Sequence, residues 1–210
     1  CIANDSWRNS MNILKKVLQH EVFPALGFTE PISVAYAASI AGRELDDEVE
    51  KISITVDPGV FKNGFAVTIP NTDGERGNLF AGVLGALIKQ PDLKMELLKS
   101  VEADMINKAK SLIRTGKATI SYDTSKKNLF IEVTIKSGGD SARAVLANSH
   151  MNLVHLAVNN RVLFEKEYQA ASSGDQDYKQ VLKQMRITGF IDLAEHLDQD
   201  DYRYIEHGIE

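Results

Sequence analysis

The residues best suited to chemistry form a sharp corner between two helical patterns, from Gly27 through Phe28, Thr29 and Glu30 to Pro31. Thr29 suits the N-cap of the following helix, Glu30 complements the positive end of its dipole, and Pro31 fits its first turn. The free amides of such a helix N-terminus can hold a carboxylate, and Glu30 can act as a base or bind an amine. An ordinary capped corner explains the same residues, so the segment predicts a candidate site but no reaction.

Two polar loops follow predicted strands and add groups that recognise an amino acid. One loop contains Lys62, Asn63 and Gly64, and the other contains Asn71 and Thr72. A cation, side-chain amides and a hydroxyl suit the carboxylate and the amine of an amino-acid ligand. Asn-Gly and Asp-Gly pairs also serve hairpin turns, so substrate binding and turn formation remain alternatives for both loops.

The third candidate is the segment Ser149–Asn152, which contains His150 at a predicted strand junction. A histidine there can act as a general base near neutral pH, and Asn152 is a further candidate ligand residue. The alternative is a surface or hydrogen-bonded structural histidine. His155 is expected on the opposite face or pointing outward. The histidines carry no metal-binding spacing, so no metal site is predicted.

The composition is that of a soluble globular protein and excludes several classes of partner. The chain has 210 residues, of which 43% are hydrophobic and 25% charged, with a net charge of -5. The absence of basic runs and of long apolar runs predicts neither nucleic-acid nor membrane partners. Cys1 is the only cysteine, so this chain can form no internal disulfide and no cysteine-held cofactor site. The lack of disulfides and of a signal peptide predicts a cytoplasmic protein.

Apolar periodicity predicts an α+β fold with helices packed on a mostly antiparallel sheet. Residues 1–10 are expected to be an extension before a natural start at Met11. Residues 11–168 form the predicted α+β domain with the candidate ligand site, and residues 169–210 are a polar linker and three short helices leading toward a missing C-terminal domain. The predicted helices are Met11–Phe23, Ile32–Leu45, Asn78–Lys89, one opened by Pro91, and Met105–Ile113, of which 32–45 and 78–89 are small-residue helices expected to be buried.

Strands are predicted wherever apolar and polar residues alternate. They are Glu50–Asp57, Phe65–Ile69, Ala118–Tyr122, Leu129–Ile135, Ala142–Leu146, Asn152–Ala157 and Val162–Lys166. Pro58–Gly59 and Phe61–Gly64 are predicted to be turns between the first two strands.

Taken together, these segments resemble the L-cysteine desulfidase family, whose members are also called serine dehydratase alpha-family or UPF0597 proteins. Residues Pro24–Ala35 resemble the family's PALGCTEPIAVA segment, and Phe61–Gly64 with Ile69–Thr72 resembles YKNG…IPGT. Gly82–Leu87 is similar to the ALGAL helix, and Ser149–Asn152 to the SHTN element. The ordered matches extend from Met11 to Glu210 and correspond to the N-terminal half of the family's chain.

The resemblance implies a lyase that removes the β-substituent of L-cysteine or L-serine and forms pyruvate and ammonia. It implies a [4Fe–4S] cluster for the full-length family, with ligands mainly in the C-terminal half. It also implies a small amino-acid ligand, and a C-terminal catalytic half or a second copy of the chain as partner. The family's catalytic and substrate contacts fall on Thr29, Glu30, Lys62, Asn63, His150 and Asn152.

One departure changes what is expected of this chain: Phe28 occupies the position of the motif cysteine. A phenyl ring can neither ligate iron nor transfer a proton. The chain by itself is therefore predicted to be inactive as a lyase. The alternative is a non-catalytic module that is derived from the same family and either binds an amino acid or has a regulatory role. Whether the chain is part of an enzyme therefore stays open.

Overall fold

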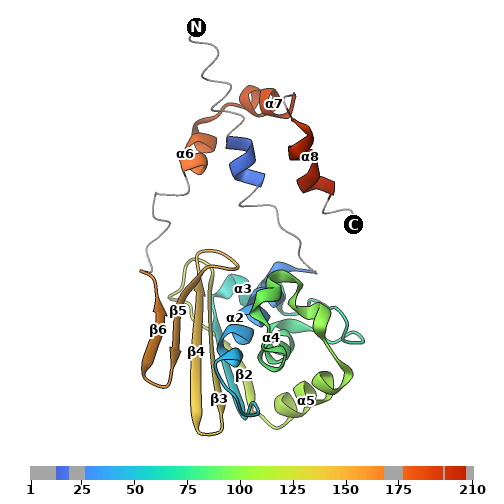
Figure 1. Ribbon diagram of the computed structural model, residues 1–210, viewed down its shortest axis with the longest axis vertical. Coiled ribbons are helices and arrows are strands. Elements are labelled where there is room, and N and C mark those ends of the chain that lie inside the picture. The colour runs from blue at the N-terminus through green and yellow to red at the C-terminus, as the bar shows by residue number, and fades with distance from the viewer. Residues whose placement is uncertain (1–12, 19–26, 168–176, 196, 207–210) are drawn as a thin grey trace. The chain divides into compact units, whose positions relative to one another are not determined.

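The structure is a computed structural model that describes residues 13–18, 27–167, 177–195 and 197–206 (Figure 1). The chain divides into two compact units. One comprises Ala25–Tyr168, and the other combines Cys1–Pro24 with Gln169–Glu210. The predicted extension 1–10 and linker 169–176 lie outside the described residues. The candidate site belongs entirely to the first unit.

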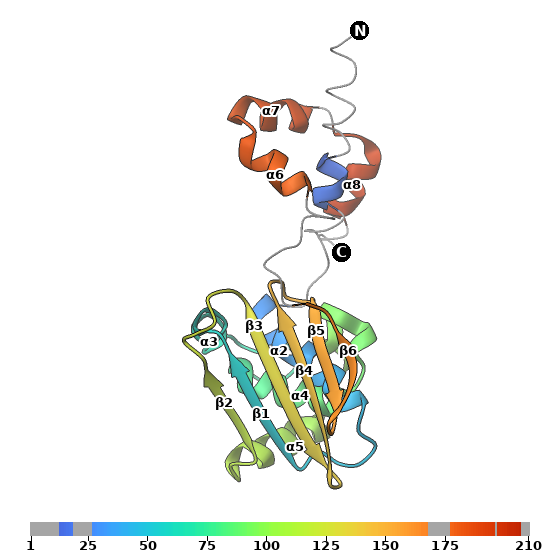
Figure 2. The same cartoon turned by 90° about the vertical axis from the view of Figure 1, so that its left-hand side faces the viewer.

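The first unit is built on a six-stranded sheet with the order β2-β1-β3-β4-β5-β6 (Figure 2). Only β1 and β2 pair in parallel, and the other neighbours are antiparallel. The strands are β1 Lys51–Val56, β2 Ala118–Tyr122, β3 Phe130–Ser137, β4 Asp140–Ala147, β5 Leu153–Val158 and β6 Arg161–Glu165. This arrangement confirms the predicted α+β class with a mostly antiparallel sheet.

Helices cover one face of this sheet, as Figures 1 and 2 show. Alternation along β1 places Ile52, Ile54 and Val56 in the core, whereas Lys51 is exposed and Ser53 and Thr55 are partly exposed. The same alternation in β3 buries Val133 and Ile135. One face of the sheet therefore packs against helices. The other face is polar along β1 but carries a small buried apolar cluster of Phe130, Val145, Ala147 and Val154.

Two helices of small residues fill the space on that face, α2 (Thr29–Arg43) and α4 (Gly77–Ile88). Their backbones approach so closely that a Cβ on Gly85 would lie 2.0 Å from the carbonyl oxygen of Ala35. A Cβ on Gly42 would likewise lie 2.8 Å from the carbonyl oxygen of Ala86. The prediction of buried small-residue helices is thus confirmed, and α2 is held rigidly over the sheet.

The segment after β1 differs from its prediction, because Pro58–Gly64 is helix α3 and not a pair of turns. Asp57 is the N-cap of this helix: its Oδ1 accepts from the amides of Gly59 (2.7 Å) and Val60 (3.1 Å), and Pro58 fits the first position. The predicted strand Phe65–Ile69 is also wrong, since only Thr68 forms an isolated bridge, to Arg76. The chain there has no neighbouring strand long enough to build a ladder.

The remaining helices of this unit are η1 (Pro91–Ser100) and α5 (Ala103–Arg114). The helix predicted from Pro91 is a 3-10 segment, and it is interrupted at Lys94, whose φ is 50°. Leu97 and Leu98 are nevertheless fully buried and complete the core beneath α2. A helical segment does begin at Pro91, but it is a 3-10 helix with a kink and not a continuous α-helix.

The second unit consists of short helices: residues 13–18, α6 (Asp177–Gln184), α7 (Ile187–Glu195) and α8 (Gln199–Glu206). These three C-terminal helices match the predicted ones. Asp198 and Asp201 cap α8 reciprocally, each carboxylate accepting from the other residue's amide at 3.0 Å. Among the helices of the described ranges, none has the length and apolarity needed to cross a bilayer.

Candidate functional site

The N-terminus of α2 is the centre of the candidate site. Phe28 is the N-cap residue, with extended backbone (φ -72°, ψ 138°), and no side chain of the described residues caps the helix. The prediction that Thr29 is the cap is therefore wrong: Thr29 is the first helical residue, and its hydroxyl donates to Glu30 Oε2 at 3.4 Å. Because the first amides lack a side-chain acceptor, they are open to a ligand anion.

Glu30 joins this corner to the second motif. Its Oε1 accepts a hydrogen bond from Asn63 Nδ2 at 3.2 Å, at the end of α3. Glu30 is partly buried, whereas Asn63 and the adjacent Lys62 are exposed. Asp57 caps the start of α3, and the last turn of α3 contacts the first turn of α2. Glu30 and Asn63, which are 33 positions apart in the sequence, therefore form one polar surface.

His150 reaches the same corner from the turn between β4 and β5. Its Nδ1 lies 3.0 Å from the hydroxyl oxygen of Ser33, which is completely buried one turn into α2. The Ser33 hydroxyl also donates to the carbonyl oxygen of Thr29 at 2.7 Å. The imidazole is partly exposed, and its Nδ1 edge is held by the helix.

Gly27 brings the loop of Asn71 and Thr72 toward the corner. Gly27 has φ +98°, and a Cβ there would lie 3.2 Å from Cγ of Pro70. Both loop side chains are nevertheless engaged within the fold, since Thr72 Oγ1 donates to the Ile69 carbonyl at 2.6 Å and Asn71 Nδ2 to the Leu98 carbonyl at 3.1 Å. These two hydrogen bonds stabilise the loop.

Two other predicted ligand residues also make structural contacts. Asn152 Nδ2 donates to the carbonyl of Ala147 at 2.8 Å and closes the turn that carries His150. Gly64 is buried where a Cβ would lie 1.9 Å from Oδ1 of Asn78, so only glycine permits this approach of α3 to α4. These contacts hold the turn that carries His150 and the end of α3 that carries Asn63.

The donor set of this corner does not fit a thiolate-held iron–sulfur cluster. Phe28, 67% exposed at the N-cap, offers no ligand atom, and the only cysteine, Cys1, lies outside the described residues. Within the described ranges, no three His, Cys, Asp or Glu side chains gather closely enough to hold a metal ion. The groups at the corner are the first amides of α2, a carboxylate, an amide side chain and an imidazole.

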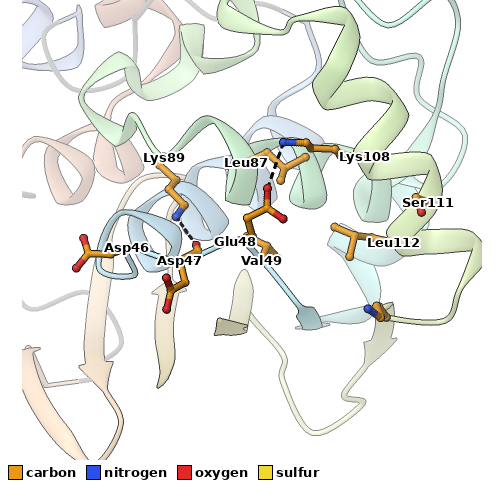
Figure 3. A pocket seen from close by; sticks show the side chains of 10 residues that line it. Asp46, Asp47, Glu48, Val49, Leu87, Lys89, Lys108, Ser111 and Leu112 are labelled. Carbon is orange, nitrogen blue, oxygen red and sulfur yellow. Dashed lines mark hydrogen bonds and ion pairs between the residues drawn. The ribbon is translucent and has the colours of Figure 1, made fainter. Parts of the chain in front are cut away.

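A cavity of about 390 Å³ lies at the other end of α2 (Figure 3). Its charged groups hold the fold together: Lys89 Nζ donates to the carbonyls of Leu45 (2.6 Å) and Asp47 (3.0 Å), and Lys108 pairs with Glu48 at 3.6 Å. Because α2 has 15 residues, this cavity is roughly 20 Å from Glu30. It contains none of the motif residues and is not part of the corner.

Two residues important to the site were not predicted from the sequence. Ser33 carries no local signal, because a serine within a small-residue helix is commonplace. Asp57 does carry one: an Asp-Pro pair is typical of an N-cap followed by proline at the first helical position. His155, predicted to point away from the site, pairs with Glu165 at 3.6 Å on the neighbouring strand.

The fold and the arrangement of these side chains define an α+β domain with a polar site at the N-terminus of the buried helix α2. Over 200 residues the chain is 45% identical to a UPF0597 protein of Geobacter sulfurreducens and 44% identical to one of Elusimicrobium minutum. A UPF0597 protein of Clostridium tetani is 33% identical over 201 residues. These alignments cover 95–96% of this chain, which belongs to the UPF0597 family in that region.

The chain spans about half the length of the curated relatives it matches, since each of these three alignments covers 47% of the relative. No family model matches the chain. No solved structure matches it either.

Proposed function

We propose that this chain is the N-terminal domain of an L-cysteine desulfidase-like or L-serine dehydratase-like lyase, which binds the amino-acid substrate at the N-terminus of α2. The observation that carries the proposal is the convergence of Glu30, Asn63 and His150 from three separate segments. Carboxylate and imidazole groups beside free helix amides suit a ligand that carries both an ammonium and a carboxylate. The motifs shared with the desulfidase family supply the reaction class.

In this proposal each group has a defined part in β-elimination. The amides that begin α2 hold the substrate carboxylate, and Glu30, oriented by Asn63, binds its ammonium. His150 takes the proton from the α-carbon and returns it to the β-substituent, which leaves as hydrogen sulfide from L-cysteine or as water from L-serine. The resulting aminoacrylate hydrolyses to pyruvate and ammonia.

The family's [4Fe–4S] cluster has no ligands among the residues of this corner. We therefore assign this chain substrate binding and proton transfer only, and we propose that any cluster is held by the other half of a full-length relative. The chain alone is then inactive, and catalysis requires that half as a partner.

A second function is favoured by Phe28, whose exposed ring lies where the family has a thiol. Here the chain retains the amino-acid site as a binding or regulatory module and has lost catalysis. This alternative keeps the same ligand, so binding alone does not separate it from the first.

The proposed site is tested by calorimetry of the chain with L-serine and L-cysteine, with D-serine as the control. Saturable binding of the L-amino acids is expected, and the absence of any binding would overturn both functions. The chain is then mixed anaerobically with the half of the Geobacter sulfurreducens relative that it does not match, and pyruvate is assayed. Pyruvate formation supports the lyase, whereas binding without pyruvate supports the module.

A further inference from the structure

The buried hydroxyl of Ser33 and the partly exposed ring of His150 form a hydrogen bond whose donor can be assigned. The Ser33 hydroxyl has one hydrogen, and its oxygen lies 2.7 Å from the Thr29 carbonyl and 3.0 Å from His150 Nδ1. These are the usual lengths of an O–H···O and an N–H···O hydrogen bond, respectively. Serine in a helix commonly donates to the carbonyl four residues earlier.

If the hydroxyl hydrogen points to Thr29, the oxygen can only accept from the imidazole. The hydrogen bond at 3.0 Å then requires a hydrogen on Nδ1. Ser33 has 0% exposure, so water does not compete for its lone pairs. No described residue hydrogen-bonds the other ring nitrogen, Nε2, which is left as an acceptor in the neutral ring.

We propose that Ser33 is a positioning residue that fixes His150 in the tautomer protonated at Nδ1, so that its Nε2 is the atom that accepts a proton. Its role in catalysis rests on the proposed function, but the tautomer itself does not. An imidazole without this partner exchanges between two tautomers, and only one of them offers Nε2 as a base. Ser33 is therefore an orienting group and not a nucleophile.

The helix offers a matched control for this pair. Ser39 is on α2 as well and is also 0% exposed, yet its hydroxyl has no hydrogen-bond partner. Ser33→Ala and Ser39→Ala therefore delete the same atom from the same helix. Only the first removes a contact with His150.

The test is nitrogen NMR of the ring-labelled chain, at a pH where the spectrum itself shows neutral rings. The five histidines are separated by comparison with His150→Gln, whose spectrum lacks one set of signals. In the unmodified chain, His150 Nδ1 is expected to resonate as a protonated nitrogen and Nε2 as an unprotonated one. In Ser33→Ala both resonances are expected to shift toward the average of the two tautomers, while Ser39→Ala leaves them unchanged.

A His150 ring protonated at Nε2 in the unmodified chain would overturn the proposal. The spectrum of the unmodified chain is enough for this test, even if Ser33→Ala does not fold. Identical ring signals in the unmodified chain and a folded Ser33→Ala variant would overturn it as well. Failure of the proposed function has a different signature: calorimetry then shows no amino-acid binding while the tautomer and its dependence on Ser33 persist.

Discussion

Oε1 of Glu30 accepts a hydrogen bond from Nδ2 of Asn63 at 3.2 Å, which links the first turn of α2 to the last turn of α3. This contact joins two sequence motifs into one polar surface. It leaves the Glu30 carboxylate oriented beside the open amides of α2.

Replacing the carboxylate of Glu30 tests its place in the ligand site. Glu30→Gln keeps the size of the side chain but removes the negative charge that binds the ligand ammonium. We expect L-serine to bind about tenfold more weakly, equivalent to about 1.4 kcal/mol. Calorimetry measures this change, with Glu44→Gln at the opposite end of α2 as the matched control. Equal weakening in the two variants would remove Glu30 from the site.

Phe28→Cys restores a thiol at the family's motif position. Because the ring is 67% exposed, the fold should tolerate its loss, and the helix N-terminus should lower the pKa of the new thiol. We expect alkylation near neutral pH to be faster than for Phe65→Cys, whose ring is 70% exposed and which is the C-cap of α3, where a helix dipole does not favour a thiolate. Rates of reaction with iodoacetamide across pH provide the measurement, and similar profiles for both variants would contradict it.

The same variant addresses catalysis. Combined anaerobically with the unmatched half of the Geobacter sulfurreducens relative, iron and sulfide, Phe28→Cys is expected to form more pyruvate than the unmodified chain. The Phe65→Cys mixture is the control. If all three mixtures produce pyruvate equally, the aromatic ring is not what limits the chemistry.

Asp57 is expected to be essential for stability. Its carboxylate is 7% exposed and accepts from the amides of Gly59, Val60 and Phe130, so it ties α3 to β3. Asp57→Ala leaves these amides without their acceptor and should lower the free energy of unfolding by about 3–4 kcal/mol. Urea unfolding tests this value. Asp123→Ala, which removes an acceptor from an exposed turn, should change stability far less.

The partly buried hydroxyl of Tyr36 is expected to make the free energy of unfolding depend on pH in the alkaline range. Burial raises the pKa of its hydroxyl, and nearby Arg43 opposes this only in part. Above the unfolded pKa of about 10, the unfolded chain loses this proton while the folded protein retains it, so the free energy of unfolding falls as pH rises. Urea unfolding between about pH 9 and pH 11 should show a shallower decline for Tyr36→Phe. The exposed Tyr122 provides the control substitution Tyr122→Phe.

Strongly periodic segments made most of the fold predictable. Alternation along Lys51–Val56 reflects a strand with one buried face, and the run of alanines after Pro31 reflects a helix buried on nearly every side. The segment Pro58–Gly64 was misread as turns, because proline, glycine and Asn-Gly also suit turns. The helix forms there because Asp57 accepts hydrogen bonds from the amides of its first turn.

The sequence by itself determined the α+β class and identified Glu30, Asn63 and His150 as residues that can bind or transfer protons. Its resemblance to the desulfidase family implies that Phe28 stands where that family has a thiol. Only the tertiary structure decided that Asn63 binds Glu30, that Thr29 is not a cap, and that Ser33 of the same helix holds His150 across 117 positions. The physical reason is that capping and periodicity depend on neighbouring residues, whereas these contacts depend on how the sheet and the helices pack.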